Sequence, residues 1–180
     1  MTRTKRIIHI AILASLASAI SILDRYLSLA LFPFIPGAKI GLANIIVLVA
    51  LMNFDFKECL LIVFLKALIG NLIPFGLTSF IIGGTASLVS FLVMYVIKRH
   101  LAKYVSYVGI GTTGAFFHTI VQVMIIIVMY KMSAEVFVYG YFYYLLLIAL
   151  ISGVLLSIIS IRVNKLYTHI YNKKEDEKVE

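Results

Sequence analysis

The chain has 180 residues, of which 62% are hydrophobic and 13% charged, and its mean hydropathy is +1.06. Soluble domains carry roughly 25% charged residues, and no water-soluble core of this size hides so much apolar surface, so we expect the lipid bilayer to solvate most of it. The net charge of +8 does not indicate nucleic-acid binding, because the basic residues lie at the ends of apolar runs. The single cysteine, Cys59, excludes a disulfide within the chain.

Six apolar segments follow one another along the chain. They cover residues 7–31, 40–54, 59–73, 77–97, 108–130 and 137–163. Asp24 and Arg25 interrupt the first segment, and Lys66 lies in the third. The second segment is short, because the chain from Lys39 to Asp55 makes about 24 Å of helix and the hydrocarbon layer is roughly 30 Å thick.

The segments predict an all-α fold, a polytopic membrane protein built as a six-transmembrane-helix bundle over residues 1–165. A charged cytoplasmic tail follows at 166–180, and we expect it to be disordered from Asn172 onward. Placing both termini in the cytoplasm of a cell-membrane protein leaves all but four of the sixteen Lys and Arg residues inside. The four exceptions are Arg25, Lys39, Lys66 and Lys131.

The N-terminus has a second interpretation. Thr2 to Arg6 is basic, an apolar stretch follows, and Ala17 to Ala19 resembles a signal-peptide cleavage site. Cleavage there would leave five spans.

Between the first two apolar segments, Phe32 to Gly37 contains two prolines and a glycine and cannot continue a helix. We interpret this apolar external loop as a lid over a cavity. The alternative is an ordinary tight connection.

Polar residues inside the apolar segments are the candidate binding groups. A charged side chain near the bilayer centre costs about 2.5–3.5 kcal/mol on insertion scales, so its presence points to function. The outer half and middle of the bundle hold three cations against one anion, Asp24, which favours an anionic or phosphate-bearing ligand; snorkelling and structural pairing are the alternatives. The predicted substrate-binding residues are Arg25, Lys39, Asn44, Lys66, Asn71, His118 and Gln122.

His118 and Gln122 share a helix face with Gly114, because the three are spaced four residues apart. A histidine or asparagine in such a place is also a common packing partner between helices, and that alternative stays open. No second histidine or carboxylate lies at metal-ligand spacing, so neither a metal site nor a cofactor is expected.

Small residues in the first segment form two rows. Ala11, Ser15 and Ala19 repeat every four residues, and Ala14 and Ser18 form a parallel row. Small residues at this spacing let helices approach closely in lipid. One row would serve the bundle itself and the other a separate membrane protein, although the sequence does not choose between them.

The sequence predicts no catalytic chemistry. A glycine-rich phosphate loop with a lysine is missing, so the chain cannot power transport with ATP by itself. The aspartates are scattered, and no Ser or Cys is singled out as a nucleophile beside a histidine. We therefore expect a protein that is not an enzyme.

Three stretches resemble the bacterial Gx transporter family, which is commonly labelled heptaprenyl diphosphate synthase component I. They are PGAKIGLAN at 36–44, similar to the family signature P-x-A-K-x-G-L-A-N, the glycine pair at 83–84, and GAFFH at 114–118 with Gln122. The resemblance extends over about residues 5–165. One departure is Thr119, where the family pattern has an asparagine.

The resemblance implies a protein similar to the substrate-binding S components of energy-coupling-factor importers. Those are six-helix proteins with both termini inside, an external lid loop, and a small-residue motif in helix one that docks a transmembrane coupling subunit driven by an ATPase pair. It thus implies capture of a small, anionic or flavin-like metabolite or vitamin, with Ala11, Ser15 and Ala19 as the docking row.

The family label implies a different role, a non-catalytic membrane subunit associated with heptaprenyl diphosphate synthase or with isoprenoid or quinone metabolism. Synthases of that kind bind diphosphate through Mg²⁺ held by aspartate-rich motifs, which this sequence lacks.

Overall fold

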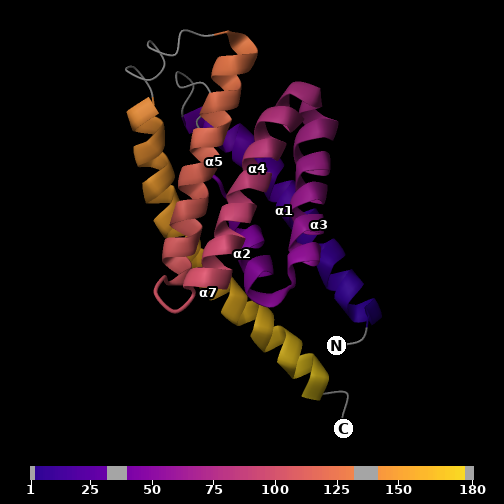
Figure 1. Ribbon diagram of the computed structural model, residues 1–180. Helices are drawn as coiled ribbons and strands as arrows, with labels where there is room; N and C mark the ends of the chain where they lie inside the picture. The colour runs from indigo at the N-terminus through magenta and orange to yellow at the C-terminus, as the bar shows by residue number, and fades with distance from the viewer. Residues whose placement is uncertain (1–2, 32–39, 132–141, 177–180) are drawn as a thin grey trace.

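The computed structural model describes residues 3–31, 40–131 and 142–176, and every regular element within them is helical. The elements are α1 (Arg3–Leu31), α2 (Asn44–Asn53), α3 (Phe56–Ala67), the π-helix η1 (Leu68–Leu72), α4 (Ile73–Leu101), α5 (Tyr107–Tyr130) and α7 (Tyr143–Asp176). They form one bundle in which α1 begins and α7 finishes at the same end (Figure 1).

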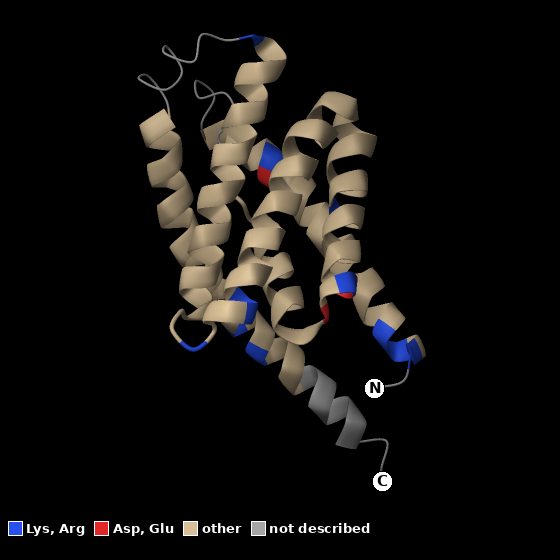
Figure 2. Cartoon of the chain, viewed as in Figure 1, with Lys and Arg blue, Asp and Glu red and all other residues tan. Residues whose placement is uncertain are grey.

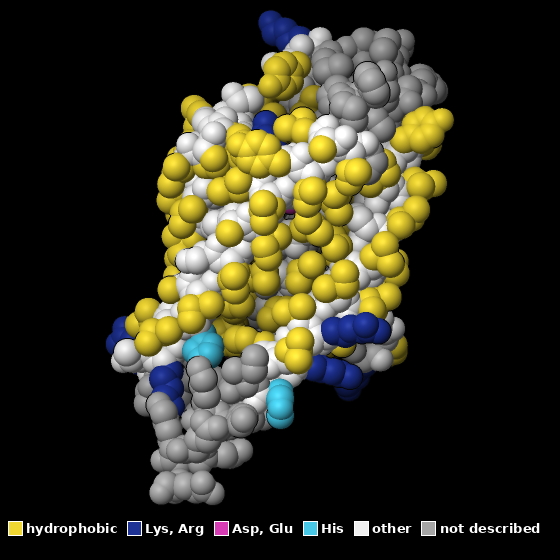
Figure 3. Space-filling model, turned by 180° about the vertical axis from the view of Figure 1, so that it is seen from behind, with side chains coloured by type: hydrophobic (Ala, Val, Ile, Leu, Met, Phe, Trp, Pro, Cys, Tyr) yellow, Lys and Arg dark blue, Asp and Glu magenta, His cyan; other side chains and the backbone are white. Residues whose placement is uncertain are grey.

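Four helical stretches of the described chain are long and apolar enough to cross a membrane, namely α1, Phe56–Leu101, α5 and Tyr143–His169. Large apolar side chains cover the middle of the bundle's outer surface, as the face in Figure 3 shows. Lys and Arg gather mainly at the end that holds both chain ends (Figure 2). An exposed apolar surface of this extent is expected only where lipid covers it. The chain is therefore a membrane protein, as its composition predicts.

The stretch Phe56–Leu101 folds back on itself at Gly76. Gly76 has φ +77° and ψ −178°, a backbone region that is essentially restricted to glycine because it has no Cβ. As a result α3 and α4 lie side by side as a hairpin (Figure 1). The expected third and fourth segments are thus two separate helices, although they meet at the hairpin without an intervening loop.

Helix α2 lies in the centre of the bundle, where it contacts α1, α3, α5 and α7. Its residues 46–51 are all buried, which explains why this helix is apolar on every side. With ten residues it is about 15 Å long, roughly half the hydrocarbon thickness. By length and composition, four stretches of the described chain can span the membrane, so these criteria do not establish the six crossings that we expected.

Ion pairs and amide contacts fix the end of the bundle where the chain begins and ends. The Arg6 guanidinium donates to Asp55 Oδ2 at 2.5 Å and to Glu58 Oε2 at 2.8 Å, which binds the start of α1 to the turn between α2 and α3. Glu58 also accepts a hydrogen bond from the Asp55 backbone N at 3.1 Å and so closes the first turn of α3. Nearby, Asn53 donates to Asn164 at 2.5 Å and joins α2 to α7.

The prediction of disorder from Asn172 onward is wrong for the residues up to Asp176, because α7 continues to that point as one helix. Lys173, Lys174 and Glu175 are good helix formers, and extending an existing helix requires no new nucleation.

Candidate functional site: a polar cluster inside the bundle

Two of the predicted binding residues, Lys66 in the last turn of α3 and Asn71 in the π-helix η1, lie inside the bundle. Lys66 and Asn71 are five residues apart, a spacing that would turn them about 140° from each other on an α-helix. Most of the chain between them belongs to η1, whose i→i+5 hydrogen bonds make a wider turn and so reduce this angle. Lys66 is 3% exposed and Asn71 2% exposed. An amine and an amide are therefore both buried in the core.

Close helix contacts hold this face in position. Lys66 Nζ donates to Asn44 Oδ1 at 3.3 Å and so links α3 to the first residue of α2. A Cβ added to Gly83 would lie 3.1 Å from the Asn71 amide nitrogen, so this glycine of α4 makes room for the amide. A Cβ on Gly70 would lie 3.0 Å from Ser21 Cβ, so α1 packs equally closely on the other side.

Asp24 anchors the backbone that leads into α2. Its two carboxylate oxygens accept hydrogen bonds from Gly41 N at 3.1 and 3.2 Å, and Ser28 Oγ, one turn later, accepts from Ile40 N at 3.1 Å. The Asn44 backbone N in turn donates to Gly41 O at 2.9 Å. Gly41 has φ +85°, which a side chain would disfavour. Asp24 thus helps to position Asn44, a role that our sequence analysis missed although the Asp24–Ser28 spacing of one helical turn was visible.

Arg25 contacts a different part of the bundle from Asp24, as adjacent residues on a helix do. Its Nη1 donates to Ser79 Oγ at 2.6 Å, and its guanidinium carbon lies 4.4 Å from the centre of the Phe75 ring, which is cation–π geometry. These contacts join α1 to the beginning of α4. The interaction of Arg25 with a ligand stays a prediction.

His118 and Gln122 are buried on α5, with exposures of 6% and 5%. Gly114 on the same face is also buried, as a shared inward face requires. Ser90 Oγ of α4 donates to Gly114 O at 2.7 Å, and a Cβ on Gly114 would collide with Met94. This face therefore packs tightly against α4, and binding by His118 and Gln122 remains a prediction.

The polar cluster, made of Asp24, Asn44, Lys66 and Asn71, lies within the part of the chain that matches a known family. The family model described as heptaprenyl diphosphate synthase component I matches residues 13–163. The chain belongs to this family. The match confirms the family label to which the sequence motifs point, and it covers all seven predicted substrate-binding residues. No curated protein and no solved structure matches the chain.

Two parts of the predicted site of this component I family member, Lys39 and the proposed lid from Phe32 to Gly37, lie outside the described residues.

Beside Asn44 there is an internal cavity of about 10 Å³, enough for about one water molecule. Among the described residues no group of three or more His, Cys, Asp or Glu side chains could hold a metal ion.

The two rows of small residues in α1 of the component I protein face opposite environments. Ala14 and Ser18 are buried in the bundle, each with 2% exposure. Ala11, Ser15 and Ala19 are exposed on the outer face of the same helix. The sequence did not show which row packs within the bundle, and the burial of Ala14 and Ser18 identifies theirs as the inner row.

Proposed function

We propose that this component I family protein is the membrane-embedded, substrate-binding subunit of an importer for a small anionic metabolite, similar to an S component of an energy-coupling-factor transporter. It is not an enzyme. It binds its substrate in the polar cluster, and partner subunits drive release on the other side of the membrane.

The burial of Lys66 carries the proposal. An amine that is 3% exposed inside an apolar membrane bundle is costly, and side chains in such positions typically line substrate or ion pathways. Lys66 Nζ donates to Asn44 Oδ1 at the start of α2. An amine held at this place offers an anionic ligand group a charge-assisted hydrogen bond, which is stronger than a bond between neutral groups. Asn71 supplies an amide on the same side for orientation.

The proposed topology has six crossings with both chain ends in the cytoplasm. An even number follows if the bundle axis is perpendicular to the membrane, because α1 begins and α7 finishes at the same end (Figure 1). The hairpin at Gly76 counts as two crossings, and α2 with its preceding segment as one. Basic residues concentrate at the end with the termini (Figure 2), which the positive-inside rule places in the cytoplasm. Asp24 and Arg25, which lie toward the end of α1 opposite the chain ends, are then on the outer side of the membrane.

The exposed row Ala11, Ser15 and Ala19 supports docking of a transmembrane coupling subunit that carries an ATPase pair. Its small side chains permit a close helix–helix approach, and apolar residues surround it.

Replacing Ala11 and Ser15 together by Leu is expected to remove the ATPase activity of partner subunits that co-purify with the chain from its own membranes. The melting temperature should stay within about 2 °C, because both side chains point outward. The matched control replaces the buried Ala14 and Ser18 by Leu, which should lower the melting temperature by several degrees. Undiminished ATPase activity with the outer-row variant would rule out docking through this row.

A second function is favoured by the family description, which names a component of heptaprenyl diphosphate synthase. In that case the chain would be a non-catalytic membrane subunit that holds a prenyl diphosphate or the catalytic partner.

Native mass spectrometry of the full chain, purified from its own membranes in mild detergent, tests the two proposals. We expect an ion heavier than the bare chain by the mass of one water-soluble anionic metabolite. A bound polyprenyl diphosphate would support the second function instead. Preparations that carry neither molecule, even after incubation with an extract of small metabolites, would contradict the importer proposal.

A further inference from the structure

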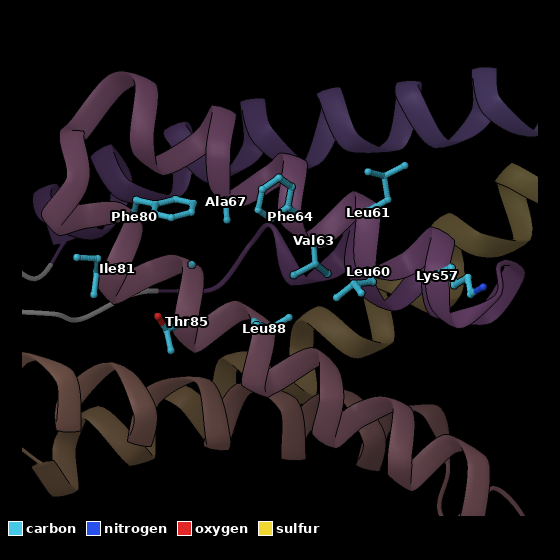
Figure 4. A pocket seen from close by; sticks show the side chains of 11 residues that line it. Lys57, Leu60, Leu61, Val63, Phe64, Ala67, Phe80, Ile81, Thr85 and Leu88 are labelled. Atoms are coloured by element: carbon cyan, nitrogen blue, oxygen red, sulfur yellow. The ribbon is translucent and has the colours of Figure 1, made fainter.

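A groove runs along the outer surface of the α3–α4 hairpin, apart from the polar cluster. It has a volume of about 570 Å³ and is open on one side. Figure 4 shows its lining as two rows of side chains, with Leu60 and Phe64 among those from α3 and Phe80 and Leu88 among those from α4. None of its lining residues is a predicted substrate-binding residue.

The length of the groove matches one leaflet of a bilayer. Lys57 and Ala67 mark its extent on α3, and the helix between them is about 15 Å long. This is half of the roughly 30 Å hydrocarbon layer. Lys57 lies in the first turn of α3, beside Asp55 and Glu58, which pair with Arg6 near the start of α1. The groove therefore begins at the end of the bundle that holds the chain ends and finishes near mid-membrane.

The shape and charge of the groove favour an extended chain with an anionic head. A helix of about 10 Å diameter occupies roughly 1,200 Å³ over the same 15 Å, about twice the volume of the groove. Among the lining residues, all in the described part of the chain, Lys57 is the one charged side chain, and it lies at the rim (Figure 4). The neighbouring carboxylates Asp55 and Glu58 both pair with Arg6. The start of α3 adds the positive end of a helix dipole.

We propose that this groove binds one acyl chain of an anionic phospholipid from the leaflet on the side of the chain ends, with its phosphate at Lys57. The apolar rows on α3 and α4 contact the part of the acyl chain nearest the headgroup. The open side of the groove faces the bilayer, so the lipid enters laterally. This binding site is independent of the importer proposal.

Competition between two lipids with identical acyl chains tests the site. The full chain is purified in detergent, incubated with equal amounts of dipalmitoyl phosphatidylglycerol and dipalmitoyl phosphatidylcholine, and analysed by native mass spectrometry. We expect phosphatidylglycerol to be retained about fivefold more, the effect typical of one cation near an anionic head. Lys57→Gln should abolish this preference, whereas Lys103→Gln, which removes another exposed Lys at the same end, should leave it intact.

A second variant tests the apolar part of the groove. A Cβ on Gly84 lies in ordinary contact with Ala67 at 3.4 Å, so the rest of a leucine side chain would extend into the groove without displacing backbone. Gly84→Leu should reduce retention of both lipids severalfold, while Val96→Leu, on the lipid-facing surface outside the groove, should not.

Equal retention of the two lipids, or a preference that survives Lys57→Gln, would overturn the proposal. It would also be overturned if farnesyl diphosphate displaced phosphatidylglycerol, or if a second copy of the chain occupied the groove and excluded the lipid.

Discussion

Replacing Lys66 by Met is expected to abolish retention of the anionic small molecule without lowering the melting temperature of the bundle. Methionine has nearly the length of lysine but no charge, so the site loses its buried amine while its shape is kept. The bilayer favours a neutral side chain at this depth by about 2.5–3.5 kcal/mol on insertion scales, and the loss of the hydrogen bond to Asn44 Oδ1 opposes this gain. Because the two effects have opposite signs, the melting temperature should change much less than ligand retention.

The measurements are ligand occupancy by native mass spectrometry and thermal unfolding in detergent. Lys66→Arg, which keeps the positive charge, should retain part of the occupancy. Arg99→Met, which removes an exposed cation at the far end of α4, should change neither quantity. Undiminished occupancy in Lys66→Met would remove Lys66 from the binding site. Loss of occupancy together with a fall of more than about 4 °C, which corresponds to more than about 1 kcal/mol, would assign Lys66 a structural role.

The sequence predicted the helices well where an apolar run ends at clear polar or aromatic boundaries. The predicted segment 108–130 became α5, Tyr107–Tyr130, and Ser106 caps its start by accepting a hydrogen bond from Gly109 N. The π-helix at Leu68–Leu72 had no such local signal. It depends on tertiary packing, with Gly70 against α1 and Asn71 against Gly83 of α4.

The sequence predicted the burial of polar residues in the candidate site better than it predicted their contacts. The cost of burying charge singled out Lys66 from the sequence, and the structure buries it. Which groups meet was not predictable, because Arg25 contacts Ser79 and Lys66 contacts Asn44 across long sequence separations. The same holds for Asp24, whose carboxylate accepts hydrogen bonds from the backbone of Gly41.

Replacing Gly153 by Leu is expected to have the largest effect on stability. A Cβ at this position would lie 2.9 Å from Ala115 Cβ and 3.1 Å from the Thr112 backbone, so α5 and α7 pack almost backbone to backbone. Helix association in lipid depends on such close packing. A leucine would force the two helices apart at a cost of about 2–3 kcal/mol, which corresponds to a fall of about 4–12 °C in Tm.

The control for Gly153→Leu is Val154→Leu, because Val154 is 39% exposed and its enlargement meets no helix backbone. This variant should unfold within about 2 °C of the natural protein. Helix α7 also packs against α2, which begins at Asn44, so Gly153→Leu should weaken ligand retention as well as stability. Lys66→Met, by contrast, should reduce retention alone. A Gly153→Leu protein as stable as the natural one would show that α5 and α7 do not approach closely. Helix α7 would then not be needed to position Asn44 of α2 against Lys66.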